Sequence, residues 1–159
     1  MAVFPTASPP PVSAGHSVLL AADAASLDAH FDVRHRVFVE QQALFAGSDR
    51  DQHDDDAATL HALGLAGQDV AGAVRLYPLD ARGLWKGDRL AVLPEARVLR
   101  LGALLVRFAV ATAGERGGDR MVAQIQLPNV RFFERLGWER VFDTEANGGR
   151  LPHGVAAAG

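Results

Sequence analysis

The chain has 159 residues, of which 48% are hydrophobic and 22% charged, and this composition is typical of one globular domain. Its formal net charge of -3 argues against a nucleic-acid surface, and the absence of cysteine excludes disulfides, thiolate metal sites and cysteine nucleophiles. It shows neither a secretory signal nor an apolar run of transmembrane length, so we expect a cytoplasmic protein without a membrane or nucleic-acid partner.

The N-terminal part of the chain predicts a tail, a strand and a helix. Residues 1–15 are rich in Pro, Ala and Ser without periodicity, so we expect a disordered tail ahead of a single domain over residues 16–159. An apolar run at 16–22 is a candidate strand. Apolar residues at mainly helical spacing then predict a helix over 26–45.

The middle of the chain predicts an acidic loop followed by three strands. The loop is AGSDRDQHDDDA, residues 46–57. Alternating apolar and polar residues predict paired strands at 59–66 and 69–79. The segment GLWKGD, 83–88, is expected to form a turn, and RLAVL, 89–93, the next strand.

The remaining elements alternate between helix and strand. An apolar stripe predicts a helix over 101–118, and RMVAQIQL, 120–127, is a candidate buried strand. The segment 128–138 begins with Pro and closes near Gly137, as helices often do. Two last strands are expected at 138–145 and 152–158, which gives an α/β domain with a mixed sheet.

A single glycine, Gly102, stands where a strand gives way to a helix. The first N–H groups of a helix have no partners within it and the helix dipole adds to their charge, so such a junction can bind an anion. A glycine that serves only the packing of the helix on the sheet is the alternative. The glycine alone does not decide between them.

The motif around this glycine resembles a coenzyme-binding loop. The run Arg97-x-x-Arg100-x-Gly102 is similar to the Q/R-x-x-G-x-G/A loop of the GNAT acyl-CoA N-acyltransferases, whose amides hold the coenzyme A pyrophosphate. The first glycine of that pattern is Arg100 here. If the family glycine has a positive φ, a β-carbon there costs about 1 kcal/mol. Arg100 either adds charge-assisted hydrogen bonds to the phosphates or faces solvent.

Four further segments resemble the same family in the same order. The segment NVRFFERLGW, which begins at Asn129, looks like the family helix "N…FYe.lGF". The others resemble a bacterial GNAT subgroup with "R..VFV.EQ", "D..D" with a histidine, "AQ" and "G.PH". Here they are RHRVFVEQQ at 34–42 with the acidic loop, Ala123-Gln124, and Gly149 with Pro152-His153.

The resemblance implies a fold and a reaction. The fold is a single GNAT-like α/β domain with a mixed, mostly antiparallel twisted sheet of about 6–7 strands, flanked by helices and splayed between strands 4 and 5. The reaction is transfer of an acetyl group from acetyl-CoA, as cosubstrate and without a metal, to a primary amine of a small molecule. The protein is expected to act as a monomer or homodimer.

The resemblance also implies which residues contact the coenzyme. The backbone near Val92 and Leu93, where the family's fourth strand bulges, is expected to polarise the thioester carbonyl. The other implied contacts are Arg97, Arg100, Leu101, Gly102, Ala103, Asn129 and Phe133. Phe133 replaces the usual tyrosine of the family helix and cannot donate a proton. The only tyrosine in the chain, Tyr77, lies at the end of a predicted strand and not in this helix.

Three residues are candidate general bases, and each has a bland alternative. Glu40 ends the helix that carries VFVEQQ and could equally be a solvated carboxylate. His153 follows Pro152 in the "PH" signature. His61 has apolar neighbours on a strand and is more simply interpreted as a structural residue of the sheet.

The acidic loop is a weaker candidate for a site. His53 with Asp51, Asp54, Asp55 and Asp56 fits no standard metal-ligand spacing, so a flexible solvated loop is the preferred interpretation. Its charge could still attract a cationic amine.

Two other functions compete with acetylation of an amine. The same fold could use a longer acyl donor or make an acylated signal. It could also be a catalytically silent acyl-CoA-binding module, an interpretation favoured by Phe133 and Arg100.

Overall fold

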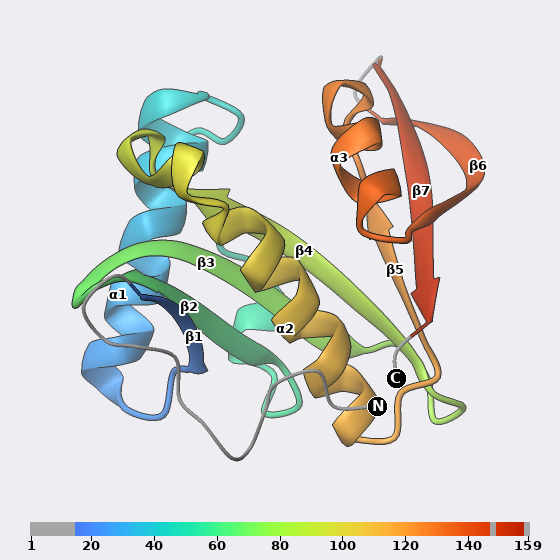
Figure 1. Ribbon diagram of the computed structural model, residues 1–159, viewed down its shortest axis with the longest axis horizontal. Helices are drawn as coiled ribbons and strands as arrows, with labels where there is room; N and C mark the ends of the chain where they lie inside the picture. The colour runs from blue at the N-terminus through green and yellow to red at the C-terminus, as the bar shows by residue number, and fades with distance from the viewer. Residues whose placement is uncertain (1–14, 147–148, 158–159) are drawn as a thin grey trace.

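The computed structural model describes residues 15–146 and 149–157, so the predicted tail lies almost wholly outside the described residues. Within them, seven strands form one sheet in the order β1-β2-β3-β4-β5-β7-β6 (Figure 1). Every neighbouring pair is antiparallel except β4 and β5, which are parallel. The strands are His16–Leu20 (β1), Leu60–Ala66 (β2), Asp69–Pro78 (β3), Leu84–Val92 (β4), Arg120–Gln124 (β5), Glu139–Ala146 (β6) and Gly149–Ala157 (β7).

Helices cover both faces of this sheet. One face carries α1 and the other carries α2 and α3 (Figure 1). The helices are Ala24–Arg34 (α1), Leu101–Glu115 (α2) and Val130–Arg135 (α3), and α1 continues as a π-helical segment, His35–Gln41 (η1). Short 3-10 turns are Gln52–Asp55 (η2), Pro94–Leu99 (η3) and Leu127–Asn129 (η4). No helix in the described part of the chain is long and apolar enough to cross a bilayer.

The helix α2 packs directly against the backbone of two strands. Leu101 and Leu105 are fully buried on its inner face. A β-carbon at Gly72 would lie 2.7 Å from Leu105 Cδ1, and one at Gly64 would lie 3.1 Å from Leu101 side-chain carbons. Glycine in β2 and β3 therefore permits the close approach that buries the apolar stripe of α2.

The prediction of a turn at GLWKGD is wrong, because all of these residues after Gly83 belong to the first part of β4. The actual turn lies earlier, where Asp80 Oδ1 accepts hydrogen bonds from the N–H groups of Arg82 and Leu84. Gly87 allows close packing against β5, since a β-carbon at this position would lie 3.0 Å from Met121 Sδ. Local turn propensity is overridden here by packing between β4 and β5.

The two central strands separate after a short common stretch, which confirms the expected splay. β4 and β5 pair only through Leu84↔Arg120, Trp85↔Met121 and Lys86↔Val122, although β4 runs on to Val92. Beyond these pairs the strands diverge (Figure 1).

A β-bulge interrupts the pairing of β4 with β3 next to the splay. Arg75 pairs with Asp88 and Ala73 with Ala91, so two residues of β4 face one of β3. The bulge residue Arg89 has a φ of 53°. The bulge expected at Val92 and Leu93 thus lies three residues earlier in the strand, because the extra residue is accommodated at Arg89.

Candidate active site

A cavity of about 440 Å³ opens where β4 and β5 diverge. Its walls come from both strands, from the inner face of α2, and from the segments that follow η1 and precede β6. Aromatic rings contribute much of its apolar lining: Phe38, Phe45, Phe133 and Trp138. Among the described lining residues, the charged ones belong to β4: Lys86, Asp88 and Arg89.

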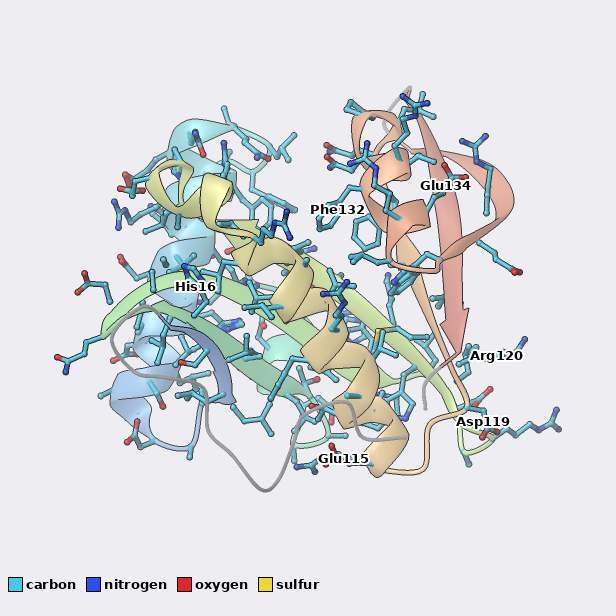
Figure 2. The ribbon with its side chains drawn as sticks, viewed as in Figure 1. His16, Glu115, Asp119, Arg120, Phe132 and Glu134 are labelled. Carbon is cyan, nitrogen blue, oxygen red and sulfur yellow. The ribbon has the colours of Figure 1, made fainter. Side chains whose placement is uncertain are left out.

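The N-terminus of α2 presents unused backbone donors near one end of β4. The amides of Leu101, Gly102 and Ala103 have no acceptor within the helix, and no side chain caps them. A β-carbon on Gly102 would make only ordinary contacts, 3.6 Å from Phe132 Cζ and 3.7 Å from Val92 Cγ2. Phe132 projects from α3 toward α2 (Figure 2), so it is a partly buried residue of this junction as well as a core residue.

The two arginines of the loop have different environments. Arg97 Nε donates to the carbonyl of Val92 at 3.1 Å and Nη2 donates to Gln41 Oε1 at 2.8 Å, which ties the loop to the end of η1. Arg100 has a φ of 61°, so its β-carbon carries the strain foreseen for a positive φ, about 1 kcal/mol. Its exposed side chain has no hydrogen bond or ion pair among the described residues.

Only one of the two amides expected to face the thioester is open to it. The N–H of Leu93 donates to the carbonyl of Ala71 at 2.9 Å and is therefore engaged in the sheet. Successive amides of a strand point to opposite edges. The N–H of Val92 is accordingly directed at the edge of β4 that faces β5.

Two of the three candidate bases, Glu40 and His61, do not line the cavity. Glu40 has a 61% exposed side chain and approaches His35 Nε2 at 3.6 Å, away from the cavity lining. His61 is buried and its Nε2 lies 3.0 Å from Asp54 Oδ1, which makes it a structural residue. The backbone of His153 pairs with Gln124, but its side chain lies outside the described residues. Asn129 and Phe133, by contrast, do line the cavity.

Asp88 lines the cavity, although the sequence analysis did not single it out. It supplies the one carboxylate among the described lining residues of the cavity. Arg75 binds it in a bidentate arrangement, with Nε to Oδ1 and Nη2 to Oδ2 both at 2.7 Å. The sequence analysis missed Asp88 because it interpreted residues 83–88 as a turn. A strand that begins before Trp85 would have placed Asp88 within β4, next to the bulge.

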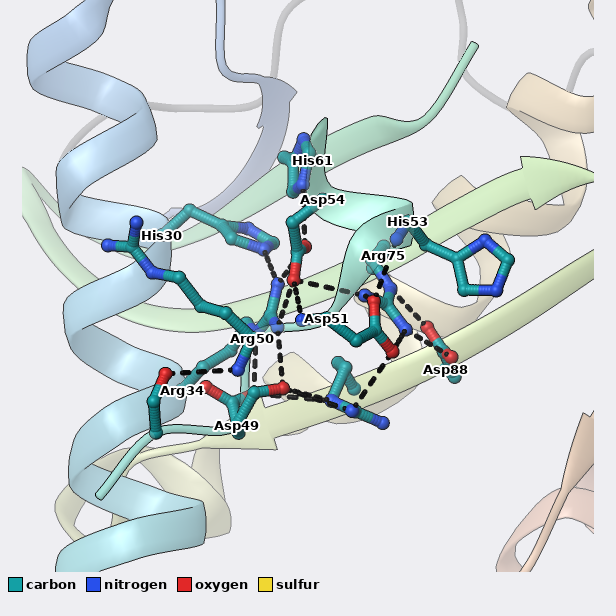
Figure 3. A network of polar contacts seen from close by, with 12 residues as sticks. His30, Arg34, Asp49, Arg50, Asp51, His53, Asp54, His61, Arg75 and Asp88 are labelled. Atoms are coloured by element: carbon teal, nitrogen blue, oxygen red, sulfur yellow. Dashed lines mark hydrogen bonds and ion pairs between the residues drawn. The ribbon is translucent and has the colours of Figure 1, made fainter. Parts of the chain in front are cut away.

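The acidic loop is not a flexible solvated segment, which corrects that expectation. Arg34, from α1, and Arg75, from β3, are both fully buried and bind its carboxylates (Figure 3). Arg34 Nε contacts Asp49 Oδ2 and Nη1 contacts Asp54 Oδ1, each at 2.7 Å. Arg75 Nη1 contacts Asp51 Oδ1 at 2.6 Å. The loop folds onto the sheet because two buried guanidinium groups require counterions.

The electrostatics of this cluster follow from those pairings. Burial alone would raise the pKa of Asp54, but hydrogen bonds from His61 and Arg34 bring it well below its ordinary value. Burial, with Asp88 nearby, raises the pKa of Tyr77 to about 12, and the His53 ring stacks on Tyr77 at 4.2 Å. Arginines thus pair with three of the loop's carboxylates, Asp49, Asp51 and Asp54. Attraction of a cationic amine by the loop stays a prediction.

Comparisons with known proteins agree with this geometry. The model of the acetyltransferase (GNAT) family matches residues 25–138. The chain is 25% identical over 123 residues to YjcF, an uncharacterized N-acetyltransferase of Bacillus subtilis. The aligned region covers 77% of this chain and 85% of YjcF.

Two solved structures show the same fold. An acyl-CoA N-acyltransferase from Pseudomonas aeruginosa superposes with a TM-score of 0.76 at 19% identity, over 89% of this chain and 99% of that one. An aminoglycoside 6'-N-acetyltransferase complexed with coenzyme A gives a TM-score of 0.72 at 13% identity, over 89% and 97% of the two chains.

Proposed function

The chain belongs to the GNAT family of acetyltransferases and is an acyl-CoA-dependent acyltransferase, and on this premise we propose that it transfers an acetyl group from acetyl-CoA to a primary amine of a small molecule. The observation that carries the proposal is the cavity at the splay of β4 and β5, beside the uncapped N-terminus of α2. A cytoplasmic location and a monomeric or homodimeric state stay predictions.

In this proposal the coenzyme lies along α2 and the splay of β4 and β5. Its pyrophosphate would lie at the amides of Leu101, Gly102 and Ala103, where unpaired N–H groups and the helix dipole favour an anion. Its pantetheine arm would run toward the splay, and the N–H of Val92 would donate to the thioester carbonyl as negative charge develops there. Arg100 can add a charge from the first turn, while Arg97 chiefly holds the loop in place.

The acceptor amine needs a base more than the thiol needs an acid. An alkylamine with a pKa of about 10.4 is mostly protonated at neutral pH, and its deprotonation costs about 4 kcal/mol. The thiol leaves readily as thiolate because its pKa is about 8.5. A phenylalanine at position 133 is therefore compatible with turnover.

We assign the role of holding the ammonium to Asp88 in place of Glu40. The carboxylate of Asp88 faces the cavity beside the bulge, and each of its oxygens has a lone pair left after binding Arg75. It can pair with the incoming ammonium and pass the proton to water. Glu40 is a solvent-exposed carboxylate at the end of η1.

The test measures thiol release from acetyl-CoA over a panel of primary amines, with octanoyl-CoA as a second donor. We expect release with acetyl-CoA, and Asp88→Asn should lower kcat/KM by roughly 10²–10⁴. Glu40→Gln is the matched control and should behave like the parent protein. Loss of activity in Glu40→Gln alone would return the role to Glu40. Release only with octanoyl-CoA would identify a longer-chain acyltransferase, and binding without release on any amine a silent module.

A further inference from the structure

One charged lining residue of the cavity has no counterion among the residues that the structure describes. Asp88 is paired with Arg75, and Arg89 contacts Asp49 Oδ2 at 3.3 Å and Asp51 Oδ2 at 3.4 Å. Lys86 also lines the cavity but makes no ion pair or hydrogen bond among the described residues. It is also the only lysine in the chain. A partly exposed lysine that lines a cavity without a counterion can bind an anion there.

Lys86 and Asp88 lie on the same face of the same strand. Side chains alternate along a strand, so two residues that are two positions apart share a face at a separation of about 7 Å. Lys86 is opposite Val122, and Gln124, two positions beyond Val122, lies on this face of β5. A cation, a carboxylate and an amide side chain thus surround the cavity where the strands begin to separate.

The position of Lys86 makes it unsuited to the phosphates of the coenzyme. The amides at the start of α2 lie by the opposite end of β4, where Val92 approaches Gly102. Val92 lies six positions after Lys86, which corresponds to about 20 Å along an extended strand. Lys86 therefore faces whatever lies beyond the thioester.

We propose that Lys86 binds a carboxylate of the acceptor, so that the acceptor is an amine that also carries a carboxylate, as amino acids do. The ammonium of such a molecule is directed at Asp88 and its carboxylate at Lys86. This inference rests on the proposed function, because it names the class of amine that the transfer uses. A dicarboxylic acyl group on the coenzyme has the same anionic chemistry and is the alternative source.

The experiment compares amino acids with the amines that lack only the carboxylate: phenylalanine with phenethylamine, and leucine with isoamylamine. Thiol release gives kcat/KM for each, and calorimetry gives the Kd of each for the protein saturated with coenzyme A. We expect at least one amino acid to be preferred by about tenfold or more in both measurements. Lys86→Met should abolish that preference, and Lys86→Arg should largely keep it. Arg82→Met, which removes an exposed cation outside the cavity lining, should leave it unchanged.

Each other outcome has a defined meaning. An unchanged preference in Lys86→Met, an equal loss for both members of a pair, or the absence of any binding of amino acids would overturn the inference. A changed ratio of succinyl-CoA to acetyl-CoA use, without a change between amino acid and amine, would place the anion on the acyl group and also overturn it. Lysine-dependent binding of amino acids without any thiol release would support the carboxylate site while refuting the proposed transfer.

Discussion

His30 is buried with both ring nitrogens in use. Its Nδ1 lies 2.8 Å from the carbonyl of Ala62, and its Nε2 lies 3.2 Å from Arg34 Nη1. A neutral ring protonated at Nδ1 satisfies both neighbours, because it donates to the carbonyl and accepts from the guanidinium. Burial, together with the charge of Arg34, lowers the pKa of His30 from 6.5 to about 3.

This lowered pKa predicts a loss of stability in mild acid. Below the unfolded pKa of 6.5 the unfolded chain binds a proton that the folded chain does not, down to a pKa of about 3. The free energy of unfolding should therefore fall as the pH falls, by up to about 1.4 kcal/mol per pH unit for this group. Urea unfolding between about pH 7 and about pH 5 measures it. His30→Gln should be less stable at neutral pH but should show a shallower slope.

The exposed His35 provides the control for this measurement. His35→Gln should keep the slope of the parent protein, since its side chain is 45% exposed. Equal slopes in His30→Gln and the parent would show that His30 does not titrate as its surroundings imply.

At the scale of elements, periodicity predicted more than local turn chemistry did. The predicted order of strands and helices is confirmed. Gly102 does not lie at a direct junction of strand and helix, however, because the turn η3 separates β4 from α2 and Gly102 is the second residue of α2. The predicted helix over 26–45 ends earlier, at Gln41. GLWKGD failed as a turn because Gly87 and Asp88, both common in turns, serve contacts with Met121 and Arg75. Those contacts join distant parts of the chain, which a local pattern does not report.

The start of α2 gives a prediction about this element. A β-carbon at Gly102 has room, with neighbours at 3.6 and 3.7 Å, so Gly102→Ala should fold normally. Gly102→Val should also fold, but its branched side chain would cover the amides at the helix start. We expect Gly102→Val to weaken acetyl-CoA binding by about tenfold or more, and Gly102→Ala to weaken it less. Calorimetry measures both, with the unfolding temperature as a check on the fold. An unchanged affinity of Gly102→Val for acetyl-CoA would show that the phosphates do not bind at the start of α2.

At the scale of the whole molecule, buried charge links α1, the acidic loop and the centre of the sheet. The pairs span from 13 residues, for Arg75 with Asp88, to 40 residues, for Arg89 with the carbonyl of Asp49. The expected coenzyme loop could be proposed from a motif because its residues are neighbours in the chain, and its role stays a prediction. Sequence patterns did not predict Lys86 and Asp88 as cavity residues or the partners of the acidic loop, because these depend on tertiary pairing.

Arg75 is the residue on which this linkage depends most. Its side chain is 1% exposed and contacts Asp51 at 2.6 Å, Asp54 at 3.1 Å and Asp88 at 2.7 Å. These contacts join β3 to the loop and to the cavity wall on β4 (Figure 3).

Arg75→Met should leave three carboxylates without their shared counterion. Removing one partner of a buried ion pair costs about 3–5 kcal/mol, so the free energy of unfolding should fall by that amount in urea titrations at neutral pH. Adding Asp88→Asn to Arg75→Met should recover part of the loss, because one buried charge then no longer needs a partner. Arg82→Met, at an exposed position in the turn before β4, is the control and should change stability by less than about 0.5 kcal/mol. A loss below about 1 kcal/mol in Arg75→Met, or a further loss in the double variant, would mean that the loop is held to the sheet by packing and not by these ion pairs.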